Sequence, residues 1–180
     1  MRSDEKSMSR ALSGVINEIK EVLVSARTNV ARQVNSELLT AYWNIGRIIC
    51  EYEQSDPERA DYGKRTIEEL SRTLTQEFGK GFSASNIQFM RRFYQAYPIQ
   101  QTVSVKLSWS HYCELLSISD PDKRSFYEKE AVNANWSVRE LKRQIESSLF
   151  ERLLLSRGDT NKEHVLSLAL KGNEISQPSD

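Results

Sequence analysis

The sequence predicts an all-α protein in which a long N-terminal helix precedes a helix-turn-helix-like helical domain. Three observations support this fold class. Apolar residues recur with a helical period through nearly the whole chain. No proline interrupts residues 9–52, and proline is the residue that a helix interior tolerates least. A turn with two glycines, Gly79-Lys80-Gly81-Phe82-Ser83, separates two short amphipathic segments.

The N-terminal helix carries an apolar seam, which we define by six residues at steps of four and three: Leu12, Ile16, Ile19, Leu23, Ala26 and Val30. This spacing is typical of a coiled coil. The pattern continues to Tyr52 with a shift of phase near Val34, and Pro57 should end it. Unbroken from Ser9 to Tyr52, the helix would be roughly 65 Å long, whereas a break near Thr28 would give two helices. The seam either joins two chains or packs on its own domain, and the sequence leaves both interpretations open.

Two helices should follow around the glycine turn. The first runs from about Lys64 to Phe78 and carries an apolar stripe. Gly79 stands where a left-handed C-cap is expected, and Ser83 is a suitable N-cap for the second helix. The second helix should end before Pro98, because the residue before a proline disfavours helical geometry. We expect residues 99–108 to form a loop or one short strand.

The remaining helices are predicted from their first residues. Ser108 should cap a short helix, and Asp120-Pro121 is a typical helix opening. Ser137 and Glu140 have the spacing of a capping box, and we expect the helix behind them to continue through Leu153. The predicted organisation is a helical segment at residues 1–55 with possible dimerisation, a helix-turn-helix-like domain at 56–160, and a linker at 161–180 toward a further domain.

Composition limits the function classes. The 180 residues contain 25 basic and 25 acidic residues, so any nucleic-acid site must be a local patch on a neutral chain. No apolar run is long enough to span a bilayer, and the N-terminus has no signal-peptide core, so we expect no membrane partner. Cys50 and Cys113 lie within apolar helical patterns, which favours buried free thiols and a cytoplasmic location.

No residue pattern in the chain predicts catalysis. Glu18-Ile19-Lys20 matches three letters of a PDDEXK nuclease motif, but that motif belongs on a strand and these residues lie in the long helix. His111 and His164 have no partners at metal-ligand spacing, and His111 fits a capping or packing role better. Gly79 and Gly81 do not complete a phosphate-binding loop. We therefore expect no catalytic site, metal, cofactor or small-molecule substrate in this chain.

The helix after Ser83 has a polar face that could contact nucleic acid. Arginine can bind phosphates or guanine edges, and glutamine can pair with adenine. Between Lys64 and Pro98, six basic residues outnumber three acidic ones. The predicted nucleic-acid-binding residues are Lys64, Arg65, Lys80, Ser85, Gln88, Arg91, Arg92 and Gln95. The alternative interpretation is the solvent-exposed face of an ordinary surface helix.

A series of short motifs adds a family resemblance. The motifs are, in order, Tyr42-Trp43-Asn44-Ile45-Gly46, Tyr62-Gly63-Lys64-Arg65, Leu70-Ser71, Phe78-Gly79-Lys80-Gly81-Phe82-Ser83, Asn86, Met90-Arg91-Arg92-Phe93-Tyr94, Leu107-Ser108-Trp109-Ser110-His111-Tyr112, Arg124-Ser125-Phe126-Tyr127 and Trp136-Ser137-Val138-Arg139-Glu140-Leu141. This order resembles the N-terminal domain of the bacterial YhcG-type proteins, over about Leu12 to Ser156. In that family a PDDEXK-type nuclease domain follows. The resemblance implies the substrate-engaging or oligomerising half of a nuclease, without its catalytic residues, and it supplies no site list.

Two function hypotheses follow from these observations. The first is a non-catalytic nucleic-acid-binding domain, with DNA as the expected partner and the seam joining chains into a homo-oligomer. The second is a protein-interaction or oligomerisation module without nucleic-acid contact. A continuous positive surface formed by the predicted basic residues would favour the first, and scattered cations would favour the second.

Overall fold

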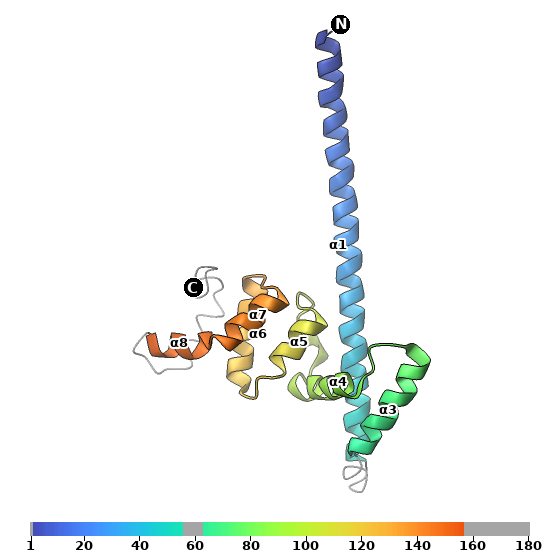
Figure 1. Ribbon diagram of the computed structural model, residues 1–180, viewed down its shortest axis with the longest axis vertical. Coiled ribbons are helices and arrows are strands. Elements are labelled where there is room, and N and C mark those ends of the chain that lie inside the picture. Colours follow the sequence, from blue (N-terminus) through green and yellow to red (C-terminus); the bar gives the residue numbers. More distant parts are fainter. Residues whose placement is uncertain (1, 56–62, 157–180) are drawn as a thin grey trace. The chain divides into compact units, whose positions relative to one another are not determined.

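The computed structural model describes residues 2–55 and 63–156, and every regular element within them is a helix (Figure 1). The elements are α1 (Arg2–Gln54), α3 (Gly63–Phe78), α4 (Ala84–Ala96), η1 (Gln100–Thr102), α5 (Trp109–Leu115), α6 (Pro121–Asn133), α7 (Val138–Glu146) and α8 (Leu149–Ser156). The all-α prediction, including the long N-terminal helix, is confirmed. The predicted linker at 161–180 lies outside the described residues.

Helix α1 is continuous for 53 residues and does not break near Thr28. The Thr28 hydroxyl donates to the carbonyl of Val24 at 2.8 Å, so this polar side chain is satisfied within the helix. By its contacts the chain divides into two units, residues 1–37 and 38–180. The described part of the first unit is a stretch of α1 alone. The second unit contains the end of α1 and all the shorter helices.

The turn between α3 and α4 has the predicted backbone chemistry. Gly79 and Gly81 both adopt positive φ values, 82° and 119°, which residues with a Cβ rarely adopt. The Ser83 hydroxyl accepts the backbone N–H of Asn86 at 3.2 Å, which makes it the N-cap of α4. The Asn86 amide donates to the carbonyl of Gly81 and accepts from Trp109 Nε1 at 2.8 Å. These bonds tie the turn to α5.

The core of the second unit is built around the buried side of α4. Phe93 is fully buried and packs against the rings of Tyr97, Trp109 and Tyr112. On the other side, α1 approaches α4 so closely that a Cβ added at Gly46 would lie 2.1 Å from the carbonyl oxygen of Met90. Because this oxygen belongs to the backbone, only glycine fits here.

One prediction about the C-terminal half is decided between its alternatives, and another is wrong. The 99–108 segment is a loop that contains the 3₁₀ helix η1 and no strand. The predicted helix through Leu153 is two helices, α7 and α8, separated where Ser148 adopts a φ of 54°. The Tyr127 hydroxyl occupies this break: it donates to the carbonyl of Gln144 at 3.1 Å and accepts the N–H of Phe150 at 3.2 Å. The backbone groups that lose their helical partners at this break therefore form hydrogen bonds with a side chain of α6.

The predicted N-caps Asp120 and Ser137 are confirmed. The Asp120 carboxylate accepts the N–H groups of Asp122 and Lys123 at the start of α6. The Ser137 hydroxyl accepts the N–H of Glu140 at the start of α7. The second half of the capping box predicted at Ser137 is replaced, because the Glu140 carboxylate accepts from Arg143 and Gln144. None of the helices within the described ranges combines the length and apolar character that crossing a membrane requires.

Candidate nucleic-acid interface

The polar side of α4 is presented to solvent because its apolar side is completely buried. Ile87, Met90 and Phe93 all have 0% exposure, which fixes the rotation of the helix about its axis. The opposite side forms what we call the α4 stripe, Ser85, Gln88, Arg92 and Gln95. Gln88 is half-buried and the other three are exposed. The structure therefore brings four of the predicted residues onto one accessible face.

The side chain of Arg91, unlike those of the α4 stripe, is held by an ion pair within the described part of the chain. Its Nε donates to Glu53 Oε2 at 2.8 Å, in an ion pair whose side chains are 33% and 12% exposed. Glu53 belongs to the last turn of α1, so the pair ties α4 to α1. The positive charge of Arg91 is matched by this carboxylate, and the side chain has a structural role that the sequence did not reveal.

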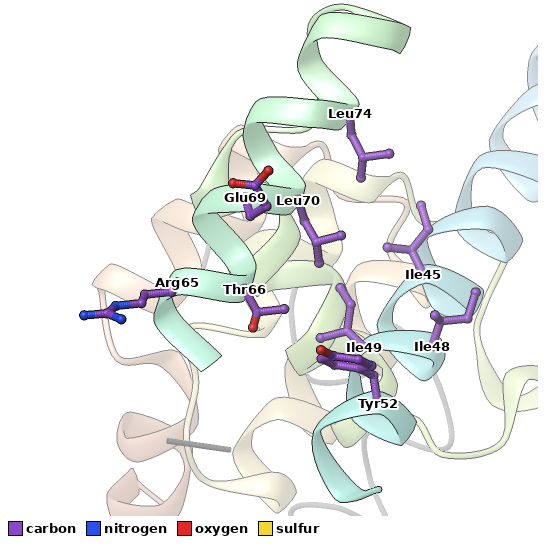
Figure 2. A pocket seen from close by; sticks show the side chains of 9 residues that line it. All are labelled: Ile45, Ile48, Ile49, Tyr52, Arg65, Thr66, Glu69, Leu70 and Leu74. Atoms are coloured by element: carbon purple, nitrogen blue, oxygen red, sulfur yellow. The ribbon is translucent and has the colours of Figure 1, made fainter. Parts of the chain in front are cut away.

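The predicted cations before α4 lie on α3 and in the turn. Arg65 and Lys80 are exposed, while the side chain of Lys64 lies outside the described residues. Arg72 of α3 is paired with Glu69 at 2.6 Å. Arg65 lines the rim of an apolar groove, and Figure 2 shows its guanidinium extending away from that groove.

This apolar groove lies between the end of α1 and α3 and has a volume of about 680 Å³. In Figure 2, Leu70 and Leu74 of α3 point toward Ile45 and Ile49 of α1. The groove is lined by Ile45, Ile48, Ile49, Tyr52, Arg65, Thr66, Glu69, Leu70 and Leu74. Apolar surface open to solvent is typical of a protein-interaction site, so this groove is relevant to the interaction hypothesis.

The seam of α1 is a second exposed apolar surface. Its large residues range from 42% exposed for Ile16 to 62% exposed for Val30. Ala26, the small residue of the seam, is exposed as well. The seam residues are Leu12, Ile16, Ile19, Leu23, Ala26 and Val30, and their role in dimerisation stays a prediction.

A polar hollow of about 360 Å³ lies beside the α4 stripe. It is lined by Arg92, Gln95, Ala96, Leu116, Ser117, Ile118, Ser119 and Arg124. Arg124 comes from α6, and its guanidinium donates to the carbonyl of Ile118 at 3.1 Å. Sequence reasoning missed Arg124, because it lies 32 positions after Arg92 and no local pattern joins the two residues.

Comparison with known proteins places the sequence in a family. A protein-family model described as "DUF1016 N-terminal domain" matches residues 18–152, which include the end of α1, the turn, the α4 stripe and the hollow. The chain belongs to this family. The predicted resemblance to YhcG-type proteins is thereby confirmed.

The sequence of this DUF1016 N-terminal domain is also similar to that of a curated protein. The protein named "Putative nuclease YhcG" from Escherichia coli (strain K12) is 40% identical over an alignment that covers 73% of this chain and 44% of that protein. The chain thus spans less than half the length of the relative it matches. No solved structure matches the chain.

In this DUF1016 N-terminal domain, the surroundings of His111 and of the two cysteines suit structural roles. His111 Nδ1 accepts the N–H of Ser108 at 3.1 Å, and its Nε2 lies 3.0 Å from the carbonyl oxygen of Trp136. This geometry assigns the proton to Nε2 and confirms the predicted capping role. Burial raises the pKa of the Cys113 thiol to about 11 and also raises that of Cys50, so both free cysteines are neutral thiols near pH 7.

The described part of this family member contains no candidate metal-binding site. Across residues 2–55 and 63–156, no group of three or more His, Cys, Asp or Glu side chains could hold a metal ion. Glu18 and Lys20 are exposed residues of α1, so the PDDEXK-like letters lie on a helix, as the sequence indicated. His164 lies outside the described residues.

Proposed function

We propose that the chain is a non-catalytic, DNA-contacting domain of a nuclease and that it contacts duplex DNA through the α4 stripe. The observation that carries the proposal is the stripe itself: two glutamines, a serine and an arginine on the accessible side of a helix whose other side is fully buried. The relative named as a nuclease supports the choice of nucleic acid as partner.

The dimensions and chemistry of α4 suit this role. Its 13 residues correspond to about 20 Å of helix, and the major groove, about 12 Å wide, admits an α-helix. The Arg92 guanidinium can bind a phosphate or a guanine edge, and the Gln88 and Gln95 amides can pair with adenine. The buried apolar side anchors α4, so the helix backbone that carries these groups is held in place before DNA arrives.

The proposed contact set differs from the sequence-based one in the role of Arg91. Because Arg91 is paired with Glu53, we assign it to positioning α4 and leave DNA contact to Arg92, Gln88, Gln95 and Ser85. Arg65 and Lys80 are exposed and are the further candidates for phosphate contacts, which set affinity and carry no sequence information. Lys64 stays a sequence-based candidate, because its side chain lies outside the described residues.

A fluorescence-anisotropy titration of labelled duplex DNA at two salt concentrations tests the proposal. Replacing Arg92 with Ala should cost about 1–3 kcal/mol of binding free energy and reduce the slope of log K against log salt by about one. Arg139→Ala, which removes an exposed cation from α7, is the matched control and should leave binding unchanged. Equal binding by wild type and Arg92→Ala would refute the α4 stripe as the contact surface.

A second function, self-association through α1, is favoured by the exposed seam. Six regularly spaced apolar residues facing water are costly unless another surface covers them. We propose that two copies pair along this seam as a coiled coil, which would present two α4 stripes to one duplex. If self-association occurs without any DNA binding, the chain is an interaction module instead.

A further inference from the structure

We infer that the polar hollow beside α4 is a binding site for a single phosphate group. The inference rests on the proposed function when that phosphate belongs to a nucleic-acid backbone. Free phosphate has the same chemistry and would occupy the same site. Arg92 and Gln95 belong both to the α4 stripe and to the hollow. A DNA strand lying along the stripe would therefore bring a phosphate to its edge.

The charge of the lining favours an anion. Two arginines and no acidic residue line the hollow. Arg92 forms no ion pair with any described residue. The carboxylate nearest along the chain, Asp120, accepts two N–H groups at the start of α6. A phosphate would thus meet two positive charges without a lining carboxylate to repel it, while the partly buried Glu128 carboxyl interacts with Arg124 from outside the lining.

The guanidinium of Arg124 is oriented by a hydrogen bond that leaves other N–H donors for a phosphate. One of its NH groups donates to the carbonyl of Ile118 at 3.1 Å, which orients the planar guanidinium and leaves most of its five N–H donors for other acceptors. The Ser119 hydroxyl adds a neutral donor to the lining. The Gln95 amide also lines the hollow, but its side chain is a hydrogen-bond partner of the Cys50 thiol as well. Several convergent donors suit the oxygens of a phosphate better than the two oxygens of a carboxylate.

A hollow on α7 provides the contrast within the same molecule. It is lined by Ser137, Arg139, Glu140, Lys142, Arg143 and Glu146. Two of these lining residues are carboxylates, and Arg143 is already paired with Glu140 at 2.6 Å. The carboxylates neutralise most of the positive charge in the α7 hollow. We therefore expect no phosphate to bind there, and this hollow serves as the control.

Nuclear magnetic resonance of the arginine Nε–H groups in the full chain tests the site directly. Sodium phosphate should shift the Arg92 and Arg124 signals in a saturable manner, whereas sodium acetate at equal ionic strength should not. Arg124→Gln should abolish the phosphate effect on Arg92. Arg124→Lys keeps the charge and should weaken phosphate binding by about tenfold, because the ammonium lacks the guanidinium fork. Lys142→Gln, in the control hollow, should leave phosphate binding unchanged.

Duplex titrations with the same variants separate this inference from the proposed function. Arg124→Gln should weaken duplex binding by about tenfold, with thermal melting used to confirm that the variant is folded. If wild type binds DNA and folded Arg124→Gln binds equally well, the hollow holds no backbone phosphate and the proposed function stands. If phosphate shifts Arg92 and Arg124 but DNA does not bind, the phosphate site stands and the proposed function fails. Equal shifts with acetate, or no shift with phosphate, overturn the inference.

Discussion

Two adjacent arginines of α4 have different surroundings and should respond differently to mutation. Arg91→Ala removes the partner of Glu53, a carboxylate that is only 12% exposed, and should lower the free energy of unfolding by about 1–2 kcal/mol. Arg92→Ala removes an exposed side chain and should change it by less than about 0.5 kcal/mol. Urea denaturation of the two variants checks this, and equal stabilities would contradict the structural role of Arg91.

Among the described glycines, Gly46 is predicted to be the least replaceable. Gly46→Ala places a methyl group 2.1 Å from the Met90 carbonyl oxygen, and separating α1 from α4 should cost about 3 kcal/mol or more. Gly14→Ala is the control, because nothing lies within 4 Å of its added Cβ, and alanine should favour α1 by about 1 kcal/mol. Chemical denaturation and far-UV circular dichroism measure the two effects. A Gly46→Ala variant as stable as wild type would disprove the close approach.

Glu128 should make stability depend on pH. Burial raises the pKa of its carboxyl group, although the Tyr97 hydroxyl donates to Oε2 at 2.8 Å. Because the pKa is raised on folding, the native state binds this proton more tightly than the unfolded state. The resulting stabilisation is fully present below the unfolded pKa of about 4.3 and is lost as pH rises through the folded pKa.

The variant Glu128→Gln tests this proton linkage. It removes the charge while retaining an oxygen that can accept from Tyr97. Relative to wild type it should gain stability at pH 7 to 8, and the gain should shrink as the pH falls toward 4. Denaturant unfolding across this range measures the difference. A difference that does not vary with pH would show that the carboxyl group titrates normally.

At the scale of the helix, α1 is predicted to be the self-association element. Ile19 and Leu23 are 54% and 52% exposed, so replacing both with Lys should leave the second unit folded while placing charges on the seam. Light scattering at tens of micromolar should report a multimeric wild type and a monomeric variant. A wild type that is already monomeric, or a variant with unchanged mass, would remove self-association from the proposal.

Helix ends were the most predictable elements, because their signals are local. Gly79, Ser83 and Asp120 each act within a few residues of their own position, and their predicted conformations and bonds are present. The break between α7 and α8 was not predictable from its own residues. It depends on the hydroxyl of Tyr127, which comes from α6 and reaches Gln144 and Phe150.

At the scale of the whole molecule, the same distinction between local and distant signals separates the predicted parts of the site from the missed ones. The helical period was enough to place Ser85, Gln88, Arg92 and Gln95 together. It could not indicate that Glu53, 38 positions earlier, pairs with Arg91, nor that Arg124 joins Arg92 at the hollow. Distances between residues far apart in sequence arise from packing, which one sequence does not display.

Helix α1 is continuous across both units, and its amide hydrogens should exchange with solvent at two different rates. Residues 38–54 of α1 belong to the packed second unit, so their amides should exchange with solvent only when that unit opens. Residues before Glu37 are held by helical hydrogen bonds alone in a single chain, and isolated helices open readily. Hydrogen–deuterium exchange should therefore reveal one helix with two exchange rates, and pairing along the seam should make the faster rate fall as protein concentration rises.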